Sequence, residues 1–223
     1  MKLTNKFKLS SVALASAMAM GTMAVPSMAS AEVGYNAAVS SMYLWRGQDV
    51  SNGAVMSGGI DYSHDSGFYA SGWASTGIVG GAIVAESDSG NGYELDIILG
   101  YAGEVAGVGY DISYWEIDYP QTFAEAFNEV SLGLSYEDFS VSYTTNTDSA
   151  VDYDYITLGY SYDKFGITYG MSDAGAGSEY SHVDLSYAAT DALSFTLSNP
   201  SDDGAGVAEE MLISVSYSLP IGK

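Results

Sequence analysis

Cysteine is absent from this 223-residue chain, and beyond residue 31 so is any run of 18 or more apolar residues. The lack of cysteine excludes a disulfide framework and thiolate metal sites. The lack of a long apolar run excludes a transmembrane helix from residues 32–223. A membrane protein of this kind would have to be a closed β-barrel, because lipid leaves no other way to pair every backbone group.

The first residues have the pattern of a secretory signal peptide. Lys2, Lys6 and Lys8 precede an apolar stretch from about Leu9 to Val25, and a small-residue site follows at Ala29-Ser30-Ala31. An uncleaved membrane anchor is the alternative, but the apolar stretch is short for a span. We therefore expect residues 1–31 to be a cleaved signal peptide and residues 32–223 to form one domain.

Cations are scarce in the remaining chain. Arg46, Lys164 and Lys223 oppose 28 acidic residues, so the formal net charge is −25 (3 − 28). This balance excludes nucleic acid as a partner. Acidic chains with few apolar residues are disordered, but here 47% of residues are hydrophobic and tyrosine alone numbers 19. The chain therefore has enough apolar surface to fold.

Apolar and polar residues alternate along the chain, which is the period of a strand with two different faces. No segment of comparable length has helical periodicity. We predict about twelve strands, over residues 33–47, 53–64, 67–78, 93–102, 107–118, 128–136, 139–147, 151–162, 164–171, 179–189, 192–199 and 209–219. The predicted fold class is an all-β, antiparallel up-and-down transmembrane β-barrel.

The connections between these strands form two alternating classes. Short turns are expected at 65–66, 103–106, 137–138, 163 and 190–191, and longer or more polar loops at 48–52, 79–92, 119–127, 148–150, 172–178 and 200–208. Short turns on one side and long loops on the other are typical of bacterial outer-membrane barrels. Pro120 and Pro200 fall in loops and Pro220 follows the last strand, so no proline is expected within a strand.

Tyrosine recurs where strands approach the short turns. We predict that these residues form an aromatic girdle at one membrane interface, because the ring prefers apolar surroundings and the hydroxyl prefers water. The predicted girdle consists of Tyr62, Tyr101, Tyr136, Tyr162, Tyr187 and Tyr217.

The two parities of the strands differ in character. One parity, which includes Leu95, Ile97 and Leu99, is apolar and uncharged, as a lipid-facing surface requires. The other carries Ser, Thr, Gly and most of the strand carboxylates, and we expect it to line the lumen. The predicted pore-lining residues are Arg46, Asp61, Glu94, Asp96, Asp111, Glu129, Asp184 and Glu210.

Arg46 lies on the polar parity of the first predicted strand and is almost the only cation available to an acidic lumen. We predict that it pairs with one or more of Asp61, Asp96 and Asp111. Two interpretations stay open: a salt bridge that plugs the barrel, or a constriction that sets selectivity. The role of the carboxylates is equally undecided, since they can concentrate cations or hydrogen-bond to serines in a packed interior.

Residues 41–47, Ser-Met-Tyr-Leu-Trp-Arg-Gly, and the Gly-x-Asp-Tyr-x-His-x-Ser-Gly-aromatic-Tyr element at 59–69 resemble the opening of the TorF family of putative porins. The resemblance covers the first three predicted strands and implies an outer-membrane barrel with diffusion-channel activity. Barrels of this type commonly finish on an aromatic residue, whereas this chain finishes on Pro220-Ile221-Gly222-Lys223. An internal assembly signal at Tyr217, or atypical assembly, would account for this departure.

No pattern indicates an enzyme, a cofactor or a metal site. His64 and His182 are the only histidines, and each follows a serine that would point to the opposite face of a strand. The acidic segments 88–92 and 201–204 offer oxygen ligands but lack the spacing of a calcium loop.

These observations predict a porin-like channel in the outer membrane of a Gram-negative cell, for passive diffusion of small solutes and with a preference for cations. The expected partners are outer-membrane lipids, small solutes or cations, and the barrel assembly machinery. A non-conducting structural or partner-binding barrel is the alternative, because twelve strands lie between filled and open barrels. A soluble periplasmic β protein is disfavoured, because nothing would cover the apolar face.

Overall fold

The computed structural model describes residues 31–51, 53–78, 92–120, 126–147, 153–173 and 179–221. The predicted signal peptide lies outside the described residues except for Ala31, and so do large parts of the predicted long loops. Within these ranges no helix has the length and hydropathy needed to cross a membrane.

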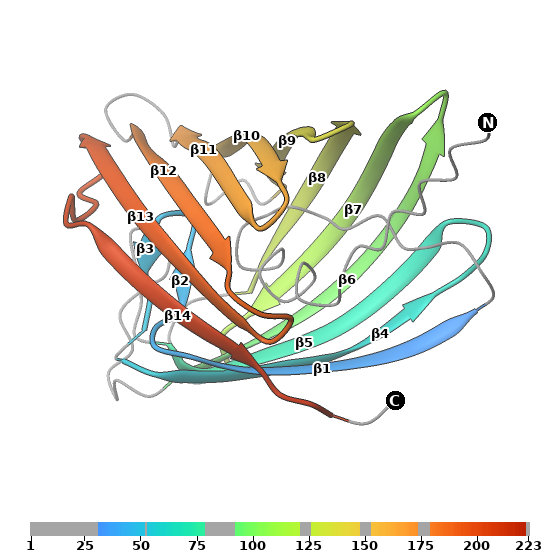
Figure 1. Cartoon of the computed structure of the whole chain (residues 1–223), viewed down its shortest axis with the longest axis horizontal. Coiled ribbons are helices and arrows are strands. Elements are labelled where there is room, and N and C mark those ends of the chain that lie inside the picture. Colours follow the sequence, from blue (N-terminus) through green and yellow to red (C-terminus); the bar gives the residue numbers. More distant parts are fainter. Residues whose placement is uncertain are drawn as a thin grey trace.

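Twelve antiparallel strands close into a barrel (Figure 1). They are β1 (Glu32–Ser40), β4 (Val55–Ser63), β5 (Phe68–Ile78), β6 (Gly92–Val105), β7 (Val108–Asp118), β8 (Phe127–Tyr136), β9 (Phe139–Asn146), β10 (Asp154–Tyr162), β11 (Phe165–Asp173), β12 (Glu179–Ala188), β13 (Leu193–Asp203) and β14 (Leu212–Ser218). Each strand pairs with its neighbour in the chain, and β1 closes the ring against β14 and β4. The predicted all-β fold with twelve up-and-down strands is confirmed.

The two faces of the strands separate as expected. On β6, Leu95, Ile97 and Leu99 are exposed on the outside of the barrel, whereas Glu94 and Asp96 are buried inside it. The six predicted girdle tyrosines are all exposed. Some stack across strands, as Tyr187 does on Phe165 with 5.0 Å between ring centroids. The outer surface is therefore a broad apolar band with aromatic residues near the turns.

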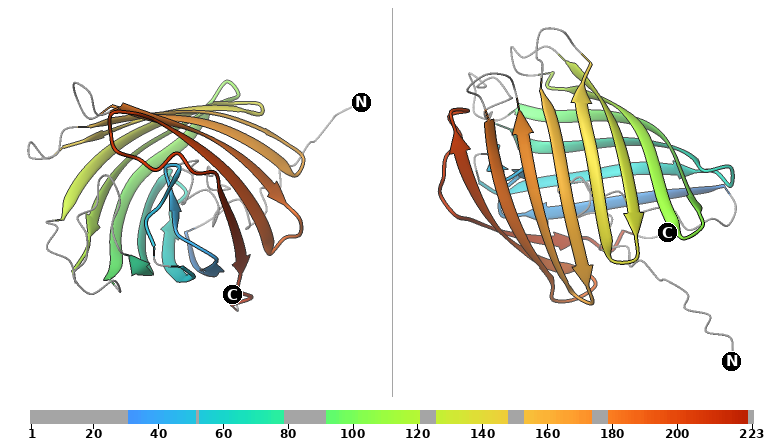
Figure 2. Two further views of the ribbon diagram at one scale, coloured as in Figure 1. Left: turned by 90° about the vertical axis from the view of Figure 1, so that its left-hand side faces the viewer. Right: turned by 90° about the horizontal axis from the view of Figure 1, so that it is seen from above.

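The first strand is shorter than predicted, and its last residues turn into the barrel. β1 ends at Ser40, and the short strands β2 (Leu44–Trp45) and β3 (Gln48–Asp49) pair only with each other. Figure 2 (left) looks in from the loop end and shows this hairpin surrounded by the barrel strands. The prediction of one strand over 33–47 is wrong, because the alternation continues through the bend and gives no sign of it.

Pro200 is also placed differently from the prediction. It belongs to β13 and pairs with His182 of β12, not to a loop. The pairing of β13 with β14 ends at Ser198, so Pro200 has a neighbouring strand on one side only. Proline is tolerated at such an edge position, because no hydrogen bond of the ladder is lost.

The interior changes character along the barrel axis. At the loop end it is filled by an apolar cluster formed by Tyr43, Val50, Val55, Ile78, Ile117, Tyr119, Phe127 and Tyr153. Towards the turns, small inward residues are only half-buried: Gly59, Gly133, Ser135, Ser140, Ser142, Gly159, Gly166, Ser186, Ser194, Thr196 and Ser216. We call this part the turn-end vestibule. The hairpin therefore fills the loop end of the interior, and the part between the hairpin and the turns is lined by small, mostly polar residues.

Candidate functional site

The inserted hairpin turns at Arg46 and Gly47, which lie between the paired residues Trp45 and Gln48. Both turn residues have positive φ, 49° and 80°, as a type I′ turn requires. Gly47 is needed for a second reason, because a Cβ there would lie 2.5 Å from the Cβ of His182. Arg46 is an unusual residue for such a turn, where Asn, Asp or Gly is preferred. The contacts that the Arg46 side chain makes therefore account for arginine at this position.

The base of the hairpin is tied to itself and to the wall. The Tyr43 amide donates to Ser51 Oγ at 2.8 Å, and the Val50 amide donates to the Tyr43 carbonyl at 3.0 Å. The Tyr43 hydroxyl donates to Glu94 Oε1 on β6 at 2.7 Å. Burial, reinforced by the nearby Glu94, raises the pKa of Tyr43 well above its ordinary value, so the hydroxyl remains a donor.

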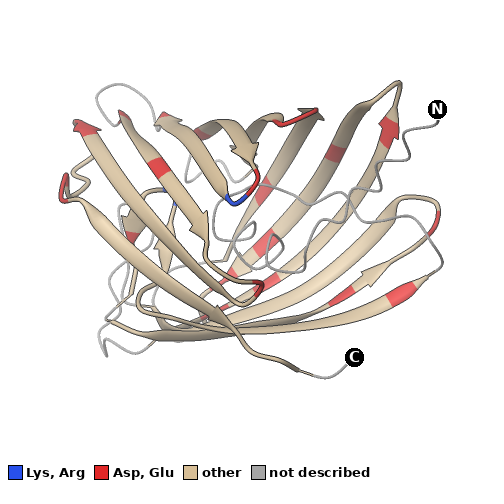
Figure 3. Cartoon of the chain, viewed as in Figure 1, with Lys and Arg blue, Asp and Glu red and all other residues tan. Residues whose placement is uncertain are grey.

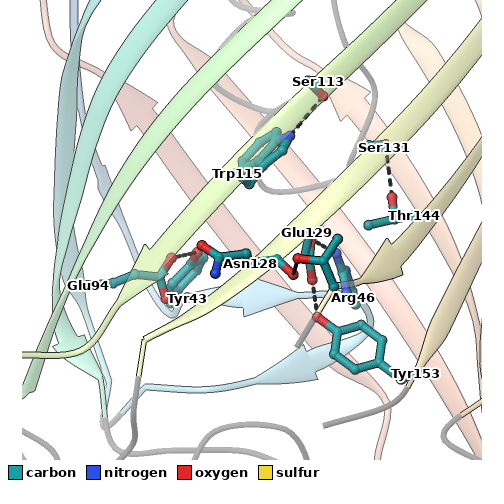
Figure 4. A network of polar contacts seen from close by, with 11 residues as sticks. Tyr43, Arg46, Glu94, Ser113, Trp115, Asn128, Glu129, Ser131, Thr144 and Tyr153 are labelled. Atoms are coloured by element: carbon teal, nitrogen blue, oxygen red, sulfur yellow. Dashed lines mark hydrogen bonds and ion pairs between the residues drawn. The ribbon is translucent and has the colours of Figure 1, made fainter. Parts of the chain in front are cut away.

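Arg46 projects from the turn to the opposite wall. Its Nη2 donates to Glu129 Oε2 on β8 at 2.7 Å, and both side chains are largely buried. The guanidinium also lies over the rings of Trp45, Tyr155 and Tyr153, with Cζ at 4.4, 4.5 and 5.5 Å from their centroids. Figure 4 shows Arg46 and Tyr153 converging on Glu129, whose Oε1 accepts from the Tyr153 hydroxyl. The charge is thus held by one carboxylate and three aromatic faces.

The cation keeps its charge in this environment. Burial lowers the pKa of Arg46, but Glu129, Tyr153 and Tyr155 together outweigh that effect, and the net pKa lies above the ordinary value. The Nη1 atom is buried and has no hydrogen-bond partner among the described residues. An unsatisfied buried donor of this kind costs about 1–3 kcal/mol. The contact between the hairpin and β8 therefore includes one energetically unfavourable feature.

The partner of Arg46 is Glu129, so the predicted pairing with Asp61, Asp96 or Asp111 is wrong. Sequence parity placed Glu129 on the inner face but could not say which strand faces the hairpin. Asp61 instead accepts hydrogen bonds from Asn36 at 2.9 Å and Ser71 at 2.5 Å. Asp111 accepts from the Tyr69 hydroxyl at 2.9 Å.

The remaining predicted pore-lining carboxylates occupy different surroundings. Glu94, Asp96 and Asp184 are buried inside the barrel. One oxygen of Asp96 and one of Asp111 have no hydrogen-bond partner within the described part of the chain. Glu210 precedes β14 and is exposed. Figure 3 shows acidic residues spread over many strands, with few basic ones among them.

A second polar network, which the sequence did not reveal, surrounds His182 beneath the hairpin turn. His182 Nδ1 lies 3.0 Å from Asp184 Oδ1, and its Nε2 lies 2.7 Å from the Tyr155 hydroxyl. Ser198 donates to the same Asp184 oxygen at 2.5 Å. Glycine at 170 makes room for this arrangement, since a Cβ there would collide with His182 Nε2.

This network is not arranged as a hydrolase triad. A nucleophilic serine would need to hydrogen-bond the histidine, whereas Ser198 is bonded to Asp184. The other histidine, His64, lies at a short turn and bonds Ser66 at 2.9 Å. Among the described residues no group of three or more His, Asp or Glu side chains is placed to hold a metal ion.

Comparison with solved structures shows a porin-like fold. The KdgM porin is similar over 83% of this chain and 99% of that chain, with 12% identity and a TM-score of 0.52. A triple mutant of the Rh. blastica porin matches over 74% of this chain and 55% of that chain, with 13% identity and a TM-score of 0.44. No curated protein matches the chain. No enzyme family is indicated.

Residues 24–199 match the family described as "Bacterial protein of unknown function (Gcw_chp)". This match covers well over half of the chain, and it includes the inserted hairpin, Glu129 and His182. The resemblance to TorF porins stays a prediction beside it. The chain belongs to the Gcw_chp family.

Proposed function

We propose that the protein is an outer-membrane channel through which small solutes diffuse passively, with a preference for cations. The observation that carries the proposal is the inserted hairpin, which narrows the interior of a closed barrel whose inward carboxylates outnumber its one inward arginine. A constriction of this kind limits solute size, and an excess of one charge inside it favours ions of the opposite sign.

The outer surface supports a place in the membrane. On β8 to β12 most outward residues are apolar and exposed, including Leu132, Leu158 and Leu185. A Lys or Arg at mid-bilayer would cost about 2–4 kcal/mol, so an uncharged band suits lipid contact. The exposed tyrosines near the turns fit an interfacial girdle. Recognition by the barrel assembly machinery stays a prediction.

The vestibule supports conduction up to the hairpin. Its wall consists of half-buried Ser, Thr and Gly residues, and such small, mostly polar residues suit a water-filled passage. The narrow zone then begins at Arg46, Glu129 and the aromatic residues around them. We propose Asp61, Glu94, Asp96, Asp111, Glu129 and Asp184 as lining residues of this path. Glu210 would act at the mouth, because it is exposed before β14.

The test is the single-channel current of the refolded protein, without residues 1–31, in a planar bilayer under a salt gradient. Discrete steps with a reversal potential that favours cations support the proposal. Steps that favour anions would remove the role assigned to the carboxylates. Heat-dependent gel mobility must first show that the barrel is folded.

A non-conducting barrel is the second candidate, and the hairpin contacts favour it. The hairpin reaches β6 through Tyr43, β8 through Arg46 and β12 through Gly47, so it bridges several parts of the wall. A folded, inserted barrel that stays silent in the bilayer would decide for this candidate.

A further inference from the structure

The guanidinium of Arg46 occupies a cage that most of its surroundings would form without it. Glu129 lies on β8, Tyr153 immediately precedes β10 and Tyr155 lies on β10, so all three belong to the barrel wall. They supply one carboxylate oxygen at 2.7 Å and two aromatic faces within 5.5 Å of the guanidinium. Aromatic faces combined with a carboxylate are the chemistry by which proteins bind organic cations.

The occupant is attached to a segment whose backbone is unfavourable for it. Arg46 has a φ of 49°, in a turn position that arginine rarely takes. One of its terminal nitrogens also has no partner among the described residues. The hairpin pairs with no barrel strand through its own two strands. A backbone bridge from Ser51 to Ile78 holds the base of the hairpin, whereas its tip is held by side chains, so a free cation can replace Arg46 in the cage.

We infer that Glu129, Tyr153 and Tyr155 form a binding site for an organic cation of the guanidinium or alkylammonium class, and that Arg46 is its tethered internal occupant. Entry of such a solute displaces the arginine and releases the hairpin tip. This inference rests on the proposed function for the access of solute to the lumen. It adds the chemical class of a preferred solute and identifies the residues that recognise it.

The same cage is poorly suited to a metal ion. It offers one carboxylate and no second acidic ligand at the guanidinium, and the described residues contain no group of metal-ligating side chains. A planar delocalised cation gains from both ring faces and from the charged hydrogen bond at once. Methylguanidinium is therefore the appropriate probe.

The test uses Arg46→Asn, which empties the cage and creates the Asn-Gly pair that a type I′ turn prefers. Binding of methylguanidinium chloride to the folded barrel in detergent is measured by titration calorimetry. We expect saturable binding at least tenfold tighter than to the unsubstituted protein. Adding Glu129→Gln to Arg46→Asn should abolish binding, whereas adding Glu116→Gln, on the outer face, should leave it unchanged.

The neutral isostere methylurea should not bind the Arg46→Asn variant. Equal binding of methylurea, or equal methylguanidinium binding with and without Glu129→Gln, would overturn the inference. If Arg46→Asn does not fold by gel mobility, Arg46→Gly serves, since glycine also tolerates the positive φ. The titration does not depend on conduction. A silent bilayer would therefore contradict the proposed channel but not the cation site, and absence of binding would contradict the cation site but not the channel.

Discussion

Arg46 and Glu129, 83 positions apart in the chain, meet at 2.7 Å inside the barrel and join the inserted hairpin to β8. Both charges are largely removed from water, so each depends on the other for compensation. The pair thereby fixes how far the hairpin reaches across the interior. Loss of this ion pair should change both the stability of the barrel and the conductance of the channel. Loss of an inward carboxylate that has no cationic partner should change mainly the ion selectivity.

Glu129→Gln should destabilise the barrel by about 3–5 kcal/mol, because it leaves Arg46 buried without its counter-charge. The looser hairpin should also raise single-channel conductance. Thermal unfolding followed by gel mobility, and bilayer recordings, measure the two effects. Glu116→Gln is the matched control, since Glu116 is exposed on the outer face. Equal effects of both substitutions would contradict the role of the Arg46–Glu129 pair in holding the hairpin.

Gly47→Ala should prevent the hairpin from seating, because the new Cβ would strike His182 and the φ of 80° strains any L side chain. The expected cost exceeds the roughly 1–3 kcal/mol that backbone strain alone imposes. Gly53→Ala is the control: its φ is 98°, but nothing lies within 4 Å of the added Cβ. Unfolding midpoints that coincide for the two variants would show that the contact with His182 is unimportant.

Leu185→Lys should cost about 2–4 kcal/mol in a bilayer, because its side chain points outward from β12. Ser186→Lys, one residue along, places the same charge in the turn-end vestibule and should cost little. Urea unfolding in vesicles compares them. A reversed order of stabilities would mean that the apolar face does not contact lipid.

The double variant Asp96→Asn, Asp111→Asn should weaken the cation preference, because each of these carboxylates has an oxygen without a hydrogen-bond partner in the described structure. The reversal potential under a salt gradient should shift toward zero, most strongly at low ionic strength where screening is weak. Glu116→Gln again serves as the control. An unchanged potential would assign selectivity elsewhere.

Much of the fold could be predicted because lipid-facing barrels impose a strict alternation. Parity alone places Leu95 and Ile97 on the outer face, and the number of strands follows from the alternation of apolar and polar residues. The bend after Ser40 escaped prediction, because Tyr43, Leu44 and Trp45 continue an aromatic-rich strand pattern and the turn residue is arginine. A hairpin that folds inward obeys no periodicity of its own.

The candidate site was harder to predict than the strands. Parity identified Glu129 and Asp184 as inward residues, but parity carries no information on which strands face each other across the interior. The pairing of Arg46 with Glu129 depends on the depth and direction of the hairpin. Likewise, the closeness of His182 to Gly47 becomes visible only when β12 is placed opposite the turn.

The seam between β1 and β14 has the shortest ladder of the ring. It runs from Ala38 opposite Ser218 to Ser40 opposite Ser216, whereas β1 pairs with β4 along its whole length. Side-chain bonds reinforce it, with Ser40 Oγ donating to Ser216 Oγ at 2.9 Å. Because local opening needs least free energy where fewest backbone bonds hold, amide hydrogens along this seam should exchange with solvent first. Tyr43, at the base of the hairpin, lies three residues beyond Ser40, so opening of the ring at this seam would also loosen the attachment of the hairpin.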